Sequence, residues 1–274
     1  MKTNIYKNSI ETIAISSGVI TILLAFFSNN FTSFIKSCEI QYFIGFLLLN
    51  IVVILFRNRA KKDISIKMTD TVKLKIFYDD IFAQEGIIVI PVNEYFDTIV
   101  DDKIISSNTV HGIFIKQVFG GDEQNLKSKI KKSLKNETST INEKRTNGNK
   151  LKYPLGTVAQ VEKNGKIYFL VVLTRFNENN RAEIKKEEYQ IVLTKLLNFT
   201  EQFSQGKVIN IPLIGGGHSG VKLSKQKLLE FLLMSIHLND NLTMINGINI
   251  VLHSSNKNEI DLNSLEYLYK VMKD

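Results

Sequence analysis

The chain has 274 residues, of which 44% are hydrophobic and 23% are charged, and its formal net charge is +8. This balance supplies a core and excludes a chain that is disordered, collagenous or of low complexity as a whole. A single cysteine, Cys38, excludes both a disulfide framework within the chain and a zinc site built from several cysteines, while the positive charge favours an anionic partner such as nucleic acid, anionic lipid or a phosphate-bearing ligand.

Two apolar segments open the chain. Residues 10–27 contain one charged residue, Glu11, and residues 40–56 contain none. A helix as long as the second segment spans about 26 Å, close to the roughly 30 Å of a bilayer's hydrocarbon core. We therefore predict a transmembrane hairpin and a basic linker in residues 1–62, with a buried core hairpin and a cleaved signal peptide as the alternatives.

Cations flank the predicted hairpin on both sides. They precede the first segment and follow the second, whereas the connecting loop holds only Lys36 against Glu39. Because cationic flanks stay on the cytoplasmic side, both ends of the chain are expected there. Asn50 lies within the second segment, and an amide in hydrocarbon prefers a partner. Self-association through Asn50 and tolerance of a lone amide both remain open.

The remaining residues alternate between strand and helix patterns. Period-two alternation, short apolar runs and the turn at Asn164-Gly165 predict strands within 63–80, 86–93, 156–176, 207–214 and 245–253. Helical periodicity predicts helices within 180–205, 225–239 and 262–274, the second of them capped by Ser224. The stripe of the first helix is expected to hold Ile184, Ile191, Leu193, Leu196, Leu197 and Phe203. Such alternation implies a mainly parallel sheet covered on both faces.

The basic segment 126–150 breaks this alternation. It carries eight cations against two acids and has little apolar periodicity after Leu134. A short helix followed by a mobile, solvated loop is the favoured interpretation. Contact with nucleic acid or lipid headgroups is the alternative, and nucleic acid is disfavoured because no aromatic residue is interleaved for base stacking.

The glycine-rich segment 211–220 is the most informative part of the sequence. A predicted strand runs into Gly215, Gly216, Gly217 and Gly220, and a predicted helix follows. Glycines at such a turn let backbone N–H groups approach an anion, and a diphosphate commonly occupies a site of this kind. The segment lacks both the Walker lysine and the dinucleotide-binding glycine spacing, so a purely structural turn is the alternative.

Polar and aromatic residues also follow other predicted strands. Asp79 and Asp80 end one strand, where they can accept a hydrogen bond from an adenine amino group or cap a helix. After the next strand, an amide suited to ribose hydroxyls and rings suited to stacking occur in Asn93, Tyr95, Phe96 and Asp97. A further turn, Thr109–Ile113, contains His111 and Gly112. Ligands of open α/β sheets bind at strand carboxyl ends, so these loops are expected to converge.

A resemblance to the macro domain family is carried by the segments FYDDIF, IIVIPVNEYFD, HGIF, PLGT and IPLIGGGHSG. More narrowly, a PVNEYFD loop joined to an N-terminal membrane hairpin is similar to the macro-type effectors of bacterial type II Thoeris antiphage systems. The resemblance implies a three-layer α/β/α macro-like domain with a mixed, mainly parallel sheet in residues 63–274. It also implies a bacterial inner-membrane protein that binds an ADP-ribose-derived signal made from NAD by a TIR-domain partner and then damages the membrane. We further expect ligand binding to drive oligomerisation.

The resemblance assigns roles to particular residues. It implies that Asp80 recognises adenine and that Asn93 holds the distal ribose, and Ile81 is also expected to contact the ligand. It implies diphosphate contacts from two loops, Val110, His111, Gly112, Ile113 and Phe114 in one and Gly215, Gly216, Gly217, His218, Ser219 and Gly220 in the other. Tyr95, Phe96 and Asp97 have no role in the family's general pattern, and we predict that they add to ligand recognition.

The sequence favours binding over catalysis. The Asn-Ala-Ala-Asn loop of hydrolytic macro domains is replaced by Ile-Pro-Val-Asn, which keeps only Asn93. Hydrolysis needs a positioned base or water, for which Asp97, His111 and His218 are the candidates, so a membrane-anchored ADP-ribosyl hydrolase is the alternative. No spacing of His, Cys or carboxylate residues resembles a metal site, and no prosthetic group is expected.

Overall fold

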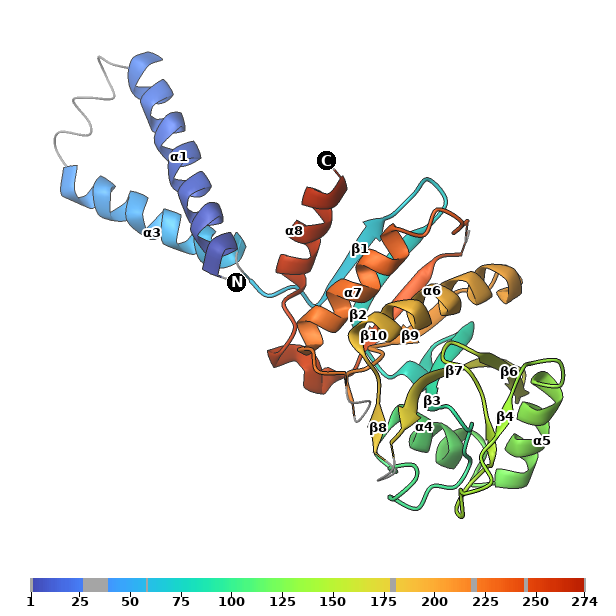
Figure 1. The fold of residues 1–274 in the computed structure, drawn as a ribbon. Coiled ribbons are helices and arrows are strands. Elements are labelled where there is room, and N and C mark those ends of the chain that lie inside the picture. The colour runs from blue at the N-terminus through green and yellow to red at the C-terminus, as the bar shows by residue number, and fades with distance from the viewer. Residues whose placement is uncertain are drawn as a thin grey trace. The chain divides into compact units, whose positions relative to one another are not determined.

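A computed structural model describes residues 2–26, 39–57, 59–177, 181–217, 221–243 and 246–273. The chain divides into two compact units. One contains Met1–Lys61 together with Asp261–Asp274, and the other contains Lys62–Ile260. In Figure 1, which is coloured by residue number, the helices of the first unit are blue and dark red. The strands of the second unit come between these helices in chain order.

The first unit is helical. It consists of α1 (Lys2–Phe26), α3 (Glu39–Arg57) and α8 (Leu262–Lys273). Both predicted apolar segments therefore fold as helices. Within the described part of the chain, neither these helices nor any other combines the length and apolar character that crossing a membrane requires. The prediction of a transmembrane hairpin is thus not supported.

Helices α1 and α3 contact each other through polar side chains. Ser16 donates to Asn50 Oδ1 over 2.8 Å, and Arg57 donates to Thr12 over 2.8 Å and pairs with Glu11 at 3.1 Å. Asn50 also donates to the backbone carbonyl of Phe46. The amide of Asn50 therefore finds its partners within its own chain. Large apolar side chains of these helices are exposed instead, among them Ile10, Ile15, Ile22, Phe43, Leu49, Leu55 and Phe56.

The second unit is built on one mixed sheet. Its strands are, from edge to edge, β1 (Asp63–Lys67), β2 (Lys73–Tyr78), β10 (Ile248–Leu252), β9 (Ile209–Pro212), β3 (Ile87–Asn93), β7 (Lys166–Phe176) and β6 (Val158–Lys163). The five strands from β2 to β7 in this order run parallel, whereas β1 and β6 are antiparallel edges. The predicted mainly parallel sheet is confirmed, as is the β6–β7 hairpin, whose turn residues Asn164 and Gly165 both have positive φ.

Apolar residues explain which strands are central. All but one residue of β3 is buried, and Ile87, Ile88, Val89 and Ile90 have no exposed surface. In β1 exposed and buried residues alternate, because this edge strand has one solvated face. The short strand β8 (Ala182–Glu183) pairs with β7, and β4 (Thr140–Ile141) pairs with β5 (Leu151–Lys152) in a separate ribbon.

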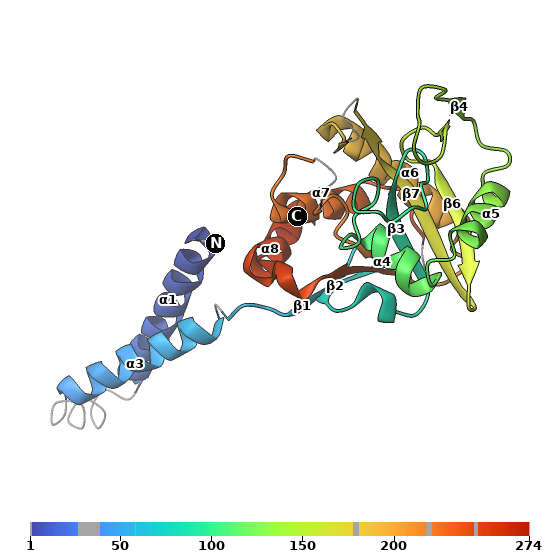
Figure 2. The ribbon, with the colours of Figure 1, turned by 90° about the horizontal axis from the view of Figure 1, so that it is seen from below.

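Helices lie on both faces of this sheet. α6 (Lys186–Phe203) and α7 (Lys225–His237) lie side by side on one face, and α4 (Val110–Ile113) and α5 (Glu123–Ser133) lie on the other (Figures 1 and 2). Ser224 caps α7 as predicted. The predicted stripe of α6 was partly wrong: Ile191 and Phe203 are exposed, and the buried positions are Tyr189, Val192, Leu193, Leu196, Leu197 and Thr200. The buried face of α6 therefore includes Tyr189, whereas the predicted face included Ile191.

The basic segment 126–150 begins with the predicted short helix, and most residues after this helix are exposed, as expected of a solvated loop. Its first part belongs to α5, and its last part leads through β4 toward β5. Arg145, in the middle of the supposed loop, is only 9% exposed. Its guanidinium is buried because a carboxylate, carbonyl oxygen and aromatic ring surround it, as described below.

Candidate ligand-binding site

A cleft of about 1290 Å³ opens at the carboxyl ends of the parallel strands. Each of the five parallel strands contributes residues at or near its end, namely Tyr78, Val251, Pro212, Asn93 and Thr174. Because the strands are parallel, the loops that follow them all meet at this edge of the sheet. The predicted convergence of the strand-end loops is therefore observed.

Acidic residues stand at the β2 end of the cleft. Asp80 Oδ1 accepts from the backbone N–H of Phe82 over 2.9 Å and so caps the short 3-10 helix η1 (Ile81–Ala83). Asp79 accepts from the N–H of Asp80 and from the side chain of Gln84, and these hydrogen bonds hold the pKa of Asp79 below its usual range. Asp80 and Ile81 both line the cleft, so the capping role and a place in the cleft coexist.

Asn93 stands at the β3 end of the cleft. It is 6% exposed, and its Oδ1 accepts from the backbone N–H of Tyr95 over 3.0 Å and of Asp97 over 3.4 Å. These bonds fix the amide with its oxygen toward the loop. The other amide atom, Nδ2, donates to no group among the described residues and is available to a ligand oxygen.

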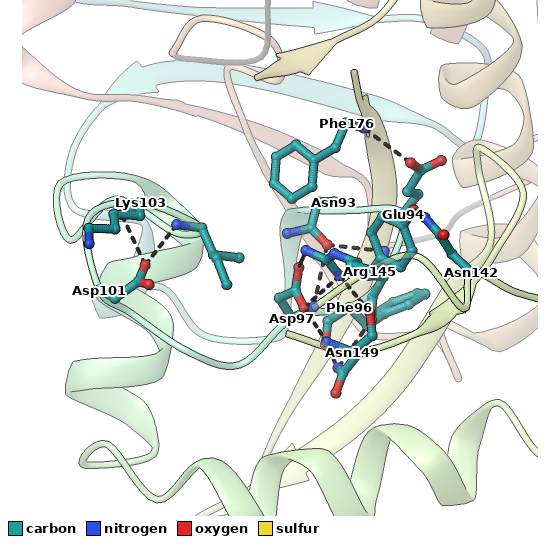
Figure 3. A network of polar contacts seen from close by, with 12 residues as sticks. Asn93, Glu94, Phe96, Asp97, Asp101, Lys103, Asn142, Arg145, Asn149 and Phe176 are labelled. Atoms are coloured by element: carbon teal, nitrogen blue, oxygen red, sulfur yellow. Dashed lines mark hydrogen bonds and ion pairs between the residues drawn. The ribbon is translucent and has the colours of Figure 1, made fainter. Parts of the chain in front are cut away.

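The three residues predicted to elaborate this loop do not line the cleft. Tyr95, Phe96 and Asp97 are all buried behind Asn93. Asp97 forms a bidentate ion pair with Arg145, at 3.0 and 2.7 Å (Figure 3). Their burial indicates that they support the loop that carries Asn93.

The turn before α4 contributes a second loop. Thr109 caps α4 by accepting from the N–H of Gly112 over 3.1 Å. A Cβ at Gly112 would lie 2.2 Å from the carbonyl oxygen of Ser106, so only glycine fits there. Val110, His111 and Ile113 line the cleft. Gly112 and Phe114 do not, and Phe114 packs against the rings of Phe119 and Tyr168.

His111 is a buried residue of the cleft wall. Burial lowers the pKa of His111 to about 3, and a backbone hydrogen bond with Asp97 opposes this only in part. The imidazole is therefore neutral at pH 7. Its Nε2 is buried without a hydrogen-bond partner in the described structure. The neutral imidazole therefore keeps one hydrogen-bonding nitrogen that no described group uses.

The glycine-rich loop lies between these two ends. Gly215, Gly216 and Gly217 line the cleft, and Gly215 has a φ of 84°, which favours glycine. The hydroxyl of Tyr189 in α6 donates to the carbonyl of Ile214 over 2.9 Å and holds the start of the loop. The predicted ligand residues His218, Ser219 and Gly220 lie outside the described residues.

Several cleft residues were not predicted. Thr174 and Phe176 come from the end of β7, and Ser254–Lys257 follow β10. The rule that loops after parallel strands meet at one edge would have found both groups, had it been applied to every strand. Four cations also line the cleft, Lys103, Arg181, Lys225 and Lys257, and no sequence pattern singled them out. Within the described residues, no cluster of three His, Cys, Asp or Glu side chains could hold a metal ion.

The mixed sheet, covered by helices on both faces and with its cleft at the strand ends, has the fold of a macro domain. A macrodomain of Oceanobacillus iheyensis with ADP shares the fold, with a TM-score of 0.54 and 14% identity over 76% of this chain and 97% of that chain. A variant of the same protein with ADPR gives a TM-score of 0.53 and 14% identity, covering 76% of this chain and 99% of that chain.

The sequence comparisons are more specific. The family described as Thoeris protein ThsA, Macro domain, matches residues 74–253. A Thoeris protein ThsA from Bacillus amyloliquefaciens (strain Y2) is 31% identical over 202 residues, which is 71% of this chain. The match spans 66% of the length of that relative. The chain belongs to the ThsA macro domain family.

Proposed function

We propose that the cleft binds ADP-ribose or a closely related derivative of NAD. The order and spacing of polar groups along the cleft carry this proposal. Asp80 follows β2 and Asn93 ends β3, and these strands are three inter-strand steps apart, which corresponds to about 14 Å. The glycine-rich loop follows β9, between them. A base, a diphosphate and a second sugar fit this order of an acid, backbone amides and an amide side chain.

Comparison with known proteins supports the same ligand class. The two Oceanobacillus iheyensis structures of this fold are described with ADP and with ADPR. In this chain, backbone groups are available for a diphosphate at the α4 turn. The N–H groups of Thr109, Gly112 and Ile113 are used within that turn, which leaves those of Val110 and His111 for a ligand. Such amides stabilise an anion without a lysine.

We propose that the site binds its ligand without hydrolysing it. Of the three candidate bases, Asp97 is held by Arg145 outside the cleft, and His111 has a pKa of about 3 because it is buried. A base with so low a pKa is a poor acceptor of a proton from water at neutral pH. The third candidate, His218, lies outside the described residues. Release of free ADP-ribose from an ADP-ribosylated substrate would contradict this proposal and favour the hydrolase alternative.

Calorimetry of the full chain with ADP-ribose tests the ligand assignment. We expect Asn93→Ala to weaken binding about tenfold, because the variant loses the side-chain donor and with it a neutral hydrogen bond worth about 1.4 kcal/mol. Asn136→Ala changes an exposed asparagine outside the cleft and should leave the affinity unchanged. No binding of ADP-ribose, its derivatives or NAD by the unaltered chain would refute the proposal.

We further propose that ligand binding drives an antiphage response at the cell membrane. A TIR-domain protein would supply the signal from NAD, and the α1–α3 pair of associated chains would disturb the bilayer. Two observations support this extension: the chain belongs to the ThsA macro domain family, and α1 and α3 expose apolar side chains while their polar side chains pair with each other. An apolar exterior of this kind suits a lipid environment.

Growth of cells that contain the TIR partner tests this extension. We expect the full chain to stop growth during phage infection and a chain that begins at Lys62 to allow it, because only the former keeps α1 and α3. Asn93→Ala in the full chain should also allow growth, which separates loss of signal from loss of the helices. Growth arrest by the shortened chain would show that the membrane is not the target.

A further inference from the structure

We infer that residues 142–153 form a clamp that positions Asn93 and His111 for the ligand. The central positioning residues are Arg145 of the clamp and Asp97 of the loop that the clamp holds. This inference rests on the proposed function and names how that site is held. Neither residue lines the cleft. Their effect on the ligand is therefore indirect, through the loop that carries Asn93.

The clamp contacts the Asn93 loop at several points. At its C-terminal end, the N–H of Tyr153 donates to the carbonyl of Glu94 over 2.8 Å, and Lys152 pairs with the Glu94 carboxylate at 3.2 Å. Asn142 donates to the hydroxyl of Tyr95 over 2.9 Å. A loop that is remote in sequence thus holds each side of the turn that follows β3. Figure 3 shows Asn142, Arg145 and Asn149 of the clamp beside the loop that carries Asn93.

The ion pair is at the centre of these contacts. Asp97 and Arg145 have side-chain exposures of 0% and 7%, and the guanidinium bonds both carboxylate oxygens. Arg145 also donates to the carbonyl of Asn149 over 2.6 Å and lies 3.7 Å from the centre of the Tyr95 ring. The backbone N–H of Asn149 donates to Asp97 over 2.8 Å. A buried carboxylate that loses such partners leaves an uncompensated charge, so the pair fixes the loop strongly.

The loop itself has a strained backbone that needs this support. Phe96 has a φ of 48°, in the left-handed region that bulky residues avoid. Its side chain is 1% exposed and packs edge-on against Tyr153, with 5.3 Å between ring centres. The Asn149 amide donates to the carbonyls of Tyr95 and Phe96. Backbone strain of this kind persists only where the surrounding contacts outweigh it.

Asp97 connects the clamp to both ligand-facing residues. Its backbone N–H donates to Asn93 Oδ1, and its backbone forms the hydrogen bond with His111. Movement of Asp97 would therefore turn the Asn93 amide and release the His111 ring together. Both residues lie at the β3 end of the cleft, where the second sugar of ADP-ribose is proposed to bind.

Binding of ADP-ribose and ADP by full-chain variants tests the inference, because ADP lacks the second sugar. We expect Arg145→Gln to weaken ADP-ribose binding about tenfold or more and ADP binding less than about twofold. Arg145→Lys should recover part of the loss, since it keeps the charge but not the bidentate geometry. Equal losses for both ligands, or no loss for ADP-ribose, would overturn the inference. Failure of the unaltered chain to bind either ligand would instead refute the proposed function.

A glycine pair provides a second, independent test. Gly148 has a φ of 81°, and a Cβ there would lie 2.4 Å from Asp97 Oδ1. Gly121 has a similar φ of 77° with no atom within 4 Å of the same position. We expect Gly148→Ala to reproduce the selective loss of ADP-ribose binding, and Gly121→Ala to retain binding despite equal backbone strain. Unchanged ADP-ribose binding by Gly148→Ala would contradict the clamp.

Discussion

At the scale of single residues, His111 shows how burial sets chemistry. The side chain lies in the wall of the cleft, and burial lowers its pKa from 6.5 to about 3. The same ring exposed to solvent would be a plausible general base near neutral pH. Here the ring remains neutral at pH 7 and is a weak base.

This burial predicts a pH dependence of stability. Because the folded-state pKa lies below the unfolded value, the unfolded chain binds more protons between pH 6.5 and about 3, and stability falls as the pH decreases through that window. The contribution of His111 reaches about 1.4 kcal/mol per pH unit well below pH 6.5. Urea denaturation at pH 7 and pH 5 should show a smaller loss for His111→Gln than for the unaltered chain. Equal losses would show that His111 is not buried in this way.

At the scale of elements, the turn into α4 is set by close packing. Thr109 caps the helix, and Gly112 lies against the carbonyl of Ser106. Three residues of this short helix, Val110, His111 and Ile113, face the cleft. The position of the helix therefore decides whether its backbone N–H groups can meet a diphosphate.

Gly112→Ala is expected to displace α4 and abolish detectable ligand binding. The added Cβ would lie 2.2 Å from the Ser106 oxygen, and this contact is with backbone, which cannot swing aside as a side chain does. A matched control is Gly18→Ala, where no atom lies within 4 Å of the added carbon. Calorimetry with ADP-ribose measures both variants. Undiminished binding by Gly112→Ala would mean that α4 does not contact the ligand.

The clamp contains a buried residue, Arg145, that the sequence did not predict. Its many cations predicted a solvated loop, and composition gives no sign that Arg145 is buried. The charge is neutralised by Asp97, which lies 48 positions earlier in the chain. Local periodicity cannot reveal such a pair, because the two partners are distant in sequence and are neighbours only in the tertiary structure.

At the scale of the whole molecule, the proposed roles divide between the two units. Every residue that lines the cleft belongs to Lys62–Ile260, and the exposed apolar side chains of α1 and α3 belong to the other unit. Sensing and the proposed membrane response therefore depend on different stretches of the chain.

This division predicts that ligand binding survives removal of the first 61 residues. A chain of residues 62–274 should bind ADP-ribose with a Kd within about twofold of that of the full chain, because no cleft residue is lost. Calorimetry on both chains under the same conditions makes the comparison. A loss of tenfold or more, in a shortened chain that still unfolds cooperatively, would mean that the helical unit supports the cleft.

The sequence by itself determined the α/β class, the central strands and most of the strand-end loops. Continuous apolar runs such as β3 and the glycines at 215–217 are local signals, and parallel strands bring their carboxyl ends together by geometry alone. Only the tertiary structure decided the roles of Tyr95, Asp97, His111 and Arg145. Whether a polar side chain faces a ligand or holds another residue depends on burial and on distant partners, and neither is encoded in local spacing.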